Sequence, residues 1–315
     1  GGSIATAGNV SFGDNVVLNS DTTIASDAGN VDFDETIDSE SGESNSLAIT
    51  TADAGSVNFG QDIGNIDALS SLTVNNSDSV TFGDNLANGD TVMNVIVDGP
   101  VTMPNTTGSD NQTLSVNTWI DTTGAAADNG GNVTLGDVTG GGNNLEISAR
   151  GDVSTQIVNL GAGELEVTLI DATDSITAAF AGAVTANGGL TITGAAGVIN
   201  NIDFDSTLTA GTTSITLGTE NDTVDVTGVA DITGNLTIDA GAGDDSIDFD
   251  DTLTVNTGNT LITLGEGTND LGIDGDATFD GNLDLTAGTG NDTVNFGDAL
   301  TAGVTVIDLG AGDNA

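Results

Sequence analysis

Cysteine, histidine, lysine and tyrosine are absent from this sequence of 315 residues, and Arg150 is its one basic side chain. Without cysteine, the chain can form no disulfide bond, thiol nucleophile or cysteine-type zinc site. Without histidine, it has neither a Ser-His-Asp triad nor an imidazole ligand for a metal. Without lysine, it can build neither a Schiff base nor a phosphate-binding P-loop. Several common kinds of catalytic and metal centre are therefore excluded.

Basic residues are so few that the 48 acidic side chains give a net charge of −47. Nucleic acid and anionic lipid repel a polyanion of this size, so we expect neither as a partner. No apolar run approaches the ~18 residues that a membrane-spanning helix needs, so we expect no membrane insertion. The first residues, 1–4, lack the basic and apolar regions of a secretion signal, so we expect any such signal to lie outside this sequence.

Aromatic residues (3%) and prolines (2) are also scarce, a composition that is typical of disorder when the net charge is high. The hydrophobic fraction of 37% is nevertheless close to that of a folded chain, and its residues are ordered along the sequence. A β-branched residue, any residue and Phe recur before Gly or Asp, as in Val10-Ser-Phe12-Gly. Strong or weak copies of this marker are about 23 residues apart, and only the interval from 101 to 133 departs strongly. The thirteen copies start at residues 10, 31, 57, 80, 101, 133, 153, 176, 202, 224, 247, 271 and 294.

Seven of the nine phenylalanines lie two residues after the start of a marker. This regularity predicts that one ring per turn stacks on the ring of the next turn, in one continuous core column. The seven residues are Phe12, Phe33, Phe59, Phe82, Phe204, Phe249 and Phe296.

Within each repeat the apolar residues alternate with a period of two, which is the period of a strand. Three short strands per repeat are separated by Asp, Gly, Asn, Thr and Ser, the residues that favour turns. The sequence therefore predicts an all-β fold, a parallel β-helix (β-solenoid) of about 13 turns of ~23 residues, as one continuous segment over residues 1–315. A string of β-sandwich domains is the alternative, but no linker-like change of composition separates such domains.

The segment 100–131 is irregular, because it contains both prolines, Pro100 and Pro104, and the only tryptophan, Trp119. Proline cannot donate to a ladder, so we expect this segment to loop out of its turn. Trp119 either covers a discontinuity in the core, which we favour, or offers a platform on which a sugar ring stacks.

Acidic residues recur at two places in the repeat. Stacked one turn apart, unit charges repel by about 0.8 kcal/mol in water and about 3 kcal/mol at an effective dielectric constant near 20. Such columns need full solvation or a counter-ion, and carboxylates favour Ca²⁺ over transition metals. Four residues after the marker lie Asp14, Asp84, Asp137, Asp251 and Asp298, with Glu35, and two residues before it lie Asp78, Asp174, Asp222, Asp245 and Asp292.

The turns concentrated in 217–315 resemble the RTX-type repeat G-G-x-G-x-D-x-U-x. The nearest copies are 240–248, Ala-Gly-Ala-Gly-Asp-Asp-Ser-Ile-Asp, and 287–295, Ala-Gly-Thr-Gly-Asn-Asp-Thr-Val-Asn. A looser copy lies at 217–225, and 264–270 carries one extra residue. The resemblance implies that calcium binds between turns. Acidic turns that are merely solvated are the alternative. The ligands that the resemblance implies are Asp222, Asp245, Asp270 and Asp292.

The earlier turns, such as Gly-Asn-Val-Ser-Phe-Gly-Asp at 8–14, resemble the repeats of large secreted bacterial surface proteins. Filamentous haemagglutinin-type adhesins, calcium-binding RTX adhesins and surface-layer proteins are the nearest types. The resemblance implies a secreted protein at the cell surface or in the extracellular matrix of a bacterium. The sequence starts and stops within a repeat, so we expect it to be a segment of a longer protein.

These observations predict a structural or adhesive extracellular rod that calcium stabilises and that is not an enzyme. Other copies stacked end to end, cell-surface glycans and host receptors are the expected partners. The alternative is a β-helix that binds or degrades a polysaccharide, but Arg150 is the only cation available to hold an acidic sugar. Residues 150–152, Arg-Gly-Asp, also match the integrin-binding tripeptide. Ice binding would need a regular Thr-x-Thr column, which we do not expect.

Overall fold

The computed structural model describes residues 1–51, 55–83, 91–104, 111–124, 130–170 and 175–315. The chain is an all-β parallel β-solenoid of about 12 turns, with about 24 residues in each turn. No helix able to cross a membrane is present among these residues. The chain divides into two compact units, residues 1–160 (unit 1) and residues 161–315 (unit 2). The parallel β-solenoid confirms the fold class predicted from the sequence.

Within each unit most turns contribute three short strands, and equivalent strands of successive turns pair in parallel. In the turn of residues 46–70, isolated bridges at Ile63 and Leu69 replace the third strand. The equivalent strands form three columns, which we call A, B and C. Along a strand, buried and more exposed residues alternate because successive side chains point to opposite faces of the sheet. The predicted period of two thus places the apolar side chains inside the coil.

Unit 1 contains the following strands. Column A consists of β1 (Gly2–Thr6), β4 (Thr22–Ser26), β7 (Ser46–Thr51), β9 (Ser71–Asn75), β12 (Val101–Met103), β15 (Val133–Leu135) and β18 (Val153–Thr155). Column B consists of β2 (Val10–Phe12), β5 (Val31–Phe33), β8 (Ser56–Phe59), β10 (Ser79–Phe82), β13 (Asn111–Leu114), β16 (Asp137–Thr139) and β19 (Val158–Gly161). Column C consists of β3 (Val16–Leu18), β6 (Ile37–Ser39), β11 (Val92–Ile96), β14 (Asn117–Asp121) and β17 (Leu145–Ala149).

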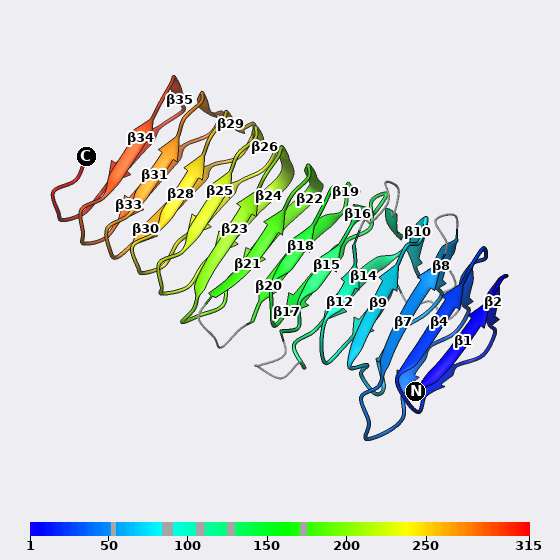
Figure 1. The fold of residues 1–315 in the computed structure, drawn as a ribbon. Coiled ribbons are helices and arrows are strands. Elements are labelled where there is room, and N and C mark those ends of the chain that lie inside the picture. The colour runs from blue at the N-terminus through cyan, green and yellow to red at the C-terminus, as the bar shows by residue number, and fades with distance from the viewer. Residues whose placement is uncertain (52–54, 84–90, 105–110, 125–129, 171–174) are drawn as a thin grey trace. The chain divides into compact units, whose positions relative to one another are not determined.

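Unit 2 repeats the same three columns, and Figure 1 shows the column A strands lying side by side. Column A consists of β21 (Ser175–Phe180), β23 (Ile199–Phe204), β25 (Thr223–Val226), β28 (Ser246–Phe249), β31 (Asp270–Ile273) and β34 (Thr293–Phe296). Column B contains β26 (Ala230–Ile232), β29 (Leu253–Val255), β32 (Ala277–Phe279) and β35 (Leu300–Ala302). Column C contains β20 (Glu164–Leu169), β27 (Leu236–Asp239), β30 (Thr260–Gly265), β33 (Leu283–Ala287) and β36 (Thr305–Asp308). The long strands β22 (Val184–Thr193) and β24 (Leu208–Thr216) extend through columns B and C.

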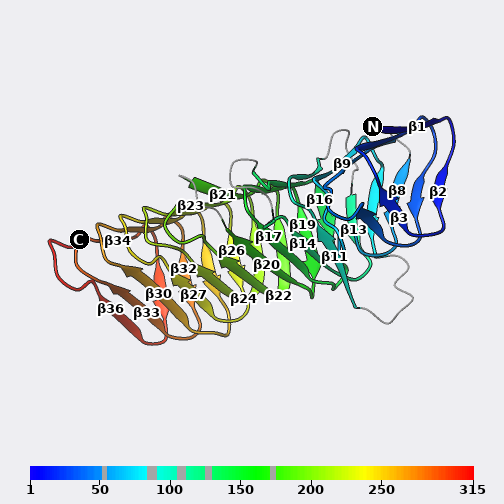
Figure 2. The same ribbon diagram turned by 90° about the horizontal axis from the view of Figure 1, so that it is seen from below.

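The two units differ in regularity. In column A of unit 2, paired residues of successive turns are 22 to 24 positions apart. Figure 2 shows the same regular stacking in column C, from β27 to β36. In unit 1 the corresponding separation ranges from 20 to 32 residues, because turns of different length connect the strands. The largest value joins Val101 to Val133, so the long interval seen in the sequence is real.

The prediction that seven phenylalanines share one column is wrong. Phe12, Phe33, Phe59 and Phe82 stack in column B of unit 1, with ring centroids 4.8, 5.6 and 5.8 Å apart. The column continues with Leu114, which pairs with Phe82. The next marker, at Val101, lies instead on β12 of column A. Strands of different columns have the same alternation of buried and more exposed residues. The marker therefore identifies a buried strand without identifying its column.

In unit 2 the phenylalanines of the marker lie in column A. Phe180 stacks on Phe204 at 4.7 Å, and Phe249 and Phe296 follow in the same column, separated by aliphatic residues. Ile176 does not have the expected register, because it pairs with Asn200, while Ile202 pairs with Ala178. The core is thus continuous within the unit even though the rings are not.

The segment 100–131 keeps three strands, β12, β13 and β14, although residues 105–110 and 125–129 lie outside the described part. The carbonyl of Pro100 accepts a hydrogen bond from the Leu72 N–H at 3.1 Å, so this proline joins a ladder as an acceptor. Trp119 does not cover the core as expected. It lies between the buried Thr118 and Ile120 of β14, so its half-buried ring is on the outer side of the strand.

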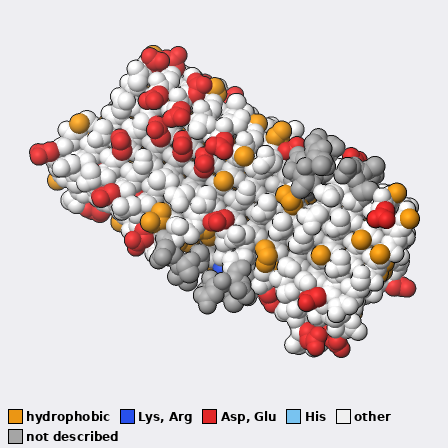
Figure 3. All heavy atoms as spheres, viewed as in Figure 1, with side chains coloured by type: hydrophobic (Ala, Val, Ile, Leu, Met, Phe, Trp, Pro, Cys, Tyr) orange, Lys and Arg blue, Asp and Glu red, His pale blue; other side chains and the backbone are white. Residues whose placement is uncertain are grey.

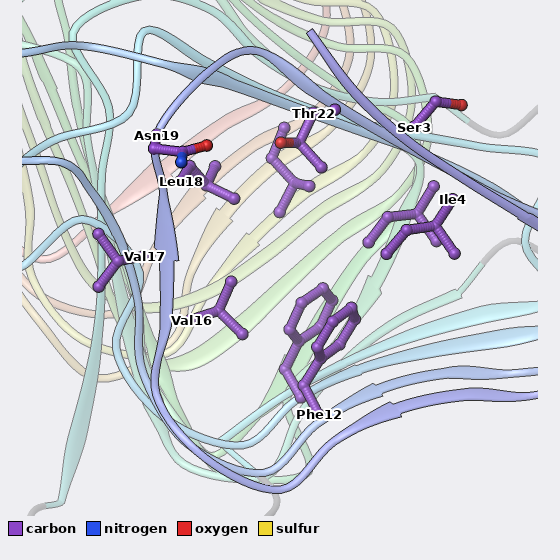
Figure 4. Close-up of a pocket in the computed structure, with 12 residues that line it drawn as sticks. Ser3, Ile4, Phe12, Val16, Val17, Leu18, Asn19 and Thr22 are labelled. Carbon is purple, nitrogen blue, oxygen red and sulfur yellow. The ribbon is translucent and has the colours of Figure 1, made fainter.

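A cavity of about 340 Å³ lies at the first turn of unit 1 (Figure 4). Ile4, Phe12, Val16 and Leu18 line it, and no titratable side chain takes part. The equivalent strands of the following turns bury their apolar residues, such as Ile24, Phe33 and Leu47. The hollow is therefore mainly apolar and is open at the first turn, where Ile4 and Val17 of its lining are exposed.

Candidate functional site: a buried Asx column and an acidic sheet face

Unit 2 contains a column of asparagine and aspartate residues at the places where its turns enter column A. We call this set the Asx column. Its first five members are each at most 2% exposed, so these polar side chains lie inside the solenoid. Glycines make the adjoining turns tight, as at Gly241 and Gly243, whose φ angles of +95° and +140° disfavour any side chain. The members are Asn200, Asp222, Asp245, Asn269, Asp292 and Asn314.

One hydrogen bond recurs between successive members of the Asx column. The backbone N–H of each member donates to Oδ1 of the member in the following turn. For Asn200, Asp222 and Asp245 as donors, the distances are 2.6, 2.8 and 3.0 Å. For Asn269 and Asp292 they are 3.0 and 2.9 Å. The side chains therefore continue, through the turn, the ladder that the backbone makes in the strands.

The second polar atom of each side chain has a more varied environment. Nδ2 of Asn269 donates to Oδ1 of Asp292 at 2.9 Å, and Nδ2 of Asn200 donates to Oδ1 of Asp222 at 3.0 Å. Oδ2 of Asp222 accepts the Gly218 N–H at 2.9 Å. Oδ2 of Asp245 and Oδ2 of Asp292 are buried and have no hydrogen-bond partner among the described residues.

Burial raises the pKa of Asp245 to about 6. The N–H of Asp222 opposes this rise by its hydrogen bond, and the nearby carboxylates of Asp222 and Asp244 add to it. A charged carboxylate with an unpartnered oxygen is costly to bury, so burial shifts the equilibrium of this group toward its protonated form.

Three of the four predicted calcium ligands, Asp222, Asp245 and Asp292, belong to the Asx column. Asp270 does not. It is the exposed first residue of β31 and pairs with Ser246 and Thr293. Residues 264–269 match 240–245 position for position, so the equivalent of Asp245 is Asn269, and the extra residue expected in this turn is not there.

Calcium takes six to eight oxygen ligands. Oδ1 of the column carboxylates is already bonded to a backbone N–H, and the unpartnered Oδ2 atoms of Asp245 and Asp292 are separated by the turn of Asn269. In the described ranges, no group of three or more Asp, Glu, His or Cys side chains is placed to hold a metal ion. The donor set does not fit a shared calcium site, and calcium binding stays a prediction from the resemblance.

A second acidic column, which the sequence analysis missed, lies on the outer side of column A in unit 2. Asp203, Asp225 and Asp248 pair in register on three successive turns. They line a groove of about 320 Å³ together with Thr223 and Ser246. Figure 3 shows carboxylates gathered on this side of unit 2. The signal was present as the Asp between the two apolar residues of the marker, as in Ile-Asp-Phe at 202–204.

The three carboxylates of this acidic face have raised pKa values. Burial is the main cause for each, and repulsion adds to it, from Asp205 at Asp203 and chiefly from Asp250 at Asp225 and Asp248. Oδ1 of Asp203 and Oδ1 of Asp225 are buried without a hydrogen-bond partner in the described structure. The face therefore concentrates negative charge that no Lys or Arg of unit 2 neutralises, since Arg150 belongs to unit 1.

The predicted acidic places outside unit 2 have no common environment. Asp84 lies outside the described residues, as does Asp174 of the unit 2 sequence. Asp137 lies within β16 and pairs with Asn111, whereas Glu35 follows a strand and accepts a hydrogen bond from Gln61 Nε2 at 2.7 Å. Variation in turn length shifts these residues relative to the strands.

The Arg150-Gly151-Asp152 tripeptide does not form a protruding loop. Arg150 forms a bridge with Gly131, and its Nε donates to the Thr123 carbonyl at 2.8 Å. Gly151 is buried and Asp152 is exposed. The guanidinium is therefore held against its own solenoid.

Threonines do recur on the outer side of column B in unit 2. Thr185 pairs with Thr209, and Thr254 pairs with Thr278, but Asp231 interrupts the series. The short strands of this column carry one outward residue between two buried ones. A plane of Thr-x-Thr pairs is not formed there.

Comparisons with protein-family models, with curated proteins and with solved structures gave no match to this chain.

Proposed function

We propose that this chain is a structural segment of a secreted bacterial surface, matrix or filament protein, in which stacked turns supply length and an anionic surface. The regular register of unit 2 carries the proposal. Paired residues of column A recur every 22 to 24 positions, and each turn places the same kinds of side chain inside and outside. Such an architecture is extended by adding turns and does not need any one turn to be special.

Charge supports the same role. With a net charge of −47, copies of the chain repel one another sideways, which opposes aggregation of exposed sheets. Acidic side chains on the outer side of column A, such as Asp225 and Asp248, reinforce this effect. The resemblance of the repeats to secreted adhesins and surface-layer proteins favours an extracellular location.

Surface display tests the proposal. The chain is placed between a membrane anchor and an epitope tag on a bacterium that has a polysaccharide layer, and antibody binding to the tag is measured. We expect binding to fall when one whole turn, residues 224–246, is deleted, and to fall further with a second turn. Tag binding that does not depend on the number of turns would contradict a role as a spacer.

A second candidate function, binding of a neutral glycan, is favoured by the position of Trp119. This only tryptophan is half-buried on the outer side of β14, where it pairs with Asn94 and Glu146. Its Nε1 donates to Ser148 Oγ at 3.2 Å, which fixes the ring. A fixed aromatic face next to amide and carboxylate groups can stack on the apolar side of a sugar and hydrogen-bond its hydroxyls.

The single tryptophan is also the probe for this candidate. We expect neutral polysaccharides to shift its fluorescence emission, and acidic ones to have no effect because the chain repels them. The Trp119→Ala variant should lose retention on an insoluble neutral polysaccharide. An unchanged emission spectrum together with equal retention of the variant would eliminate this function.

A further inference from the structure

We propose that the Asx column is a metal-independent hydrogen-bond ladder, in which either asparagine or aspartate can supply the acceptor oxygen and which takes the place that the RTX resemblance gives to calcium. The proposal rests on one repeated contact: Oδ1 of the Asx residue in each turn accepts a hydrogen bond from the backbone N–H of the equivalent residue in the preceding turn.

Both residue types make the same contact. When an aspartate supplies Oδ1, the N···O distances are 2.6, 2.8 and 3.0 Å. When Asn269 or Asn314 supplies it, they are 3.0 and 2.9 Å. The feature that asparagine and aspartate share is one acceptor oxygen at this place, and the ladder uses that oxygen. A negative charge is not required for it.

The ladder also satisfies buried backbone N–H groups. Buried N–H groups are almost always hydrogen-bonded, because an unpaired one is costly. The N–H groups of Asp222, Asp245 and Asn269 lie inside the solenoid and donate to the next member. The column begins at Asn200, since the preceding turn has Ile176 in that register. Oδ1 of Asn200 instead accepts the N–H of Ala195, in its own turn, at 2.8 Å.

The asparagines also limit repulsion between the carboxylates of the column. Asparagine separates Asp245 from Asp292, so Asp222 and Asp245 are the only carboxylates of the column in adjacent turns. Nδ2 of Asn200 and Nδ2 of Asn269 each donate to the carboxylate that follows. The amide N–H groups thus stabilise these carboxylates, as a bound cation would otherwise do.

Exchanging asparagine and aspartate tests the ladder, because a ladder and a calcium site predict opposite changes of Tm. Thermal unfolding of the whole chain is followed in EDTA and in millimolar CaCl₂, both at the same high ionic strength, so that general screening of the acidic side chains is equal. We expect the wild-type Tm to be the same in both. Asn269→Asp should lower Tm in both media, because its new oxygen faces Oδ1 of Asp292 where an amide donated before. Asp292→Asn should leave Tm unchanged or raise it, and the exposed control Asp270→Asn should have no effect.

A calcium site would give the reverse pattern. Calcium would raise the wild-type Tm, Asp292→Asn would abolish that rise, and Asn269→Asp would increase it, and this pattern would overturn the proposal. If Asn269→Asp fails to fold, the direction of the Tm change in Asp292→Asn still distinguishes the ladder from a calcium site.

Hydrogen exchange gives a local readout that general destabilisation does not. Asn269→Ala removes the acceptor of the Asp245 N–H, so this amide should exchange faster relative to the Asp222 amide, whose acceptor remains. Equal acceleration of both amides would contradict the ladder.

Discussion

At the scale of single residues, the buried carboxyl group of Asp245 links stability to pH. Its pKa is about 6 in the folded chain, against about 3.9 when unfolded. The folded state therefore holds the proton more tightly. The contribution of this group is fully present below pH 4 and is lost as the pH rises through 6. The outer carboxylates Asp203, Asp225 and Asp248 have pKa values raised in the same direction.

We predict that the free energy of unfolding falls as the pH rises from 4 to 7. Asp245 alone accounts for on the order of 2 to 3 kcal/mol of this fall. Chemical denaturation at a series of pH values measures it. Asp245→Asn should flatten the profile by that amount, and a stability that instead increases over this range would contradict the prediction.

The outer acidic face gives a prediction about salt. Asp225 lies between Asp203 and Asp248, and charges one turn apart repel by roughly 3 kcal/mol at an effective dielectric constant near 20. Exposure to water reduces this value, so we expect Asp225→Asn to stabilise the chain by about 1 kcal/mol at low ionic strength. In 1 M NaCl, where the Debye length is about 3 Å, the gain should nearly vanish. Melting curves at two salt concentrations test this, and a gain that is independent of salt would point to packing.

At the scale of the turn, glycine determines how closely two successive turns approach. Gly267 has φ of +129°, and a Cβ atom there would overlap the carbonyl oxygen of Gly243 in the preceding turn. We predict that Gly267→Ala costs on the order of 2 kcal/mol or more, since it combines an unfavourable φ with a backbone clash. Urea denaturation measures the loss.

Gly8 provides the matched control for this substitution. It has no positive φ, and a Cβ atom built on it has no neighbour within 4 Å. Gly8→Ala should therefore change the free energy of unfolding little. Equal losses at both positions would mean that a glycine lost from any turn is harmful, whatever its φ.

Strands were the best predicted elements, and their assignment to columns was the worst. The period of two identified Val10–Phe12 and Val101–Met103 equally well as buried strands. It could not show that the first belongs to column B and the second to column A, because pairing depends on the length of every intervening turn. For the same reason the Asp column at 203, 225 and 248 was overlooked: it becomes a column only when the strands are placed in register.

At the scale of the whole molecule, the repeat predicts that turns can be removed as units. Deleting residues 224–246 joins Thr223 to Ile247, which is the partner of Val224 in the next turn. The shortened chain should unfold cooperatively with a Tm within a few degrees of the original, because each turn contacts only its neighbours. Circular dichroism follows the transition.

A deletion longer by one residue, 224–247, is the control. It reverses the alternation in β28, so Phe249 would face outward. We expect this variant to be strongly destabilised. Similar melting of the two variants would show that the register between turns is loosely specified.

The sequence by itself determined the all-β class, the three strands per turn, the inward positions of the apolar residues and the polyanionic surface, because these follow from composition and local periodicity. The tertiary structure decided which residues become neighbours across turns. It placed Asn269 instead of Asp270 in the Asx column, divided the phenylalanines between two columns and put Trp119 on the outer side. Contacts between turns depend on the summed lengths of the turns, and a change of one residue moves a side chain to the opposite face.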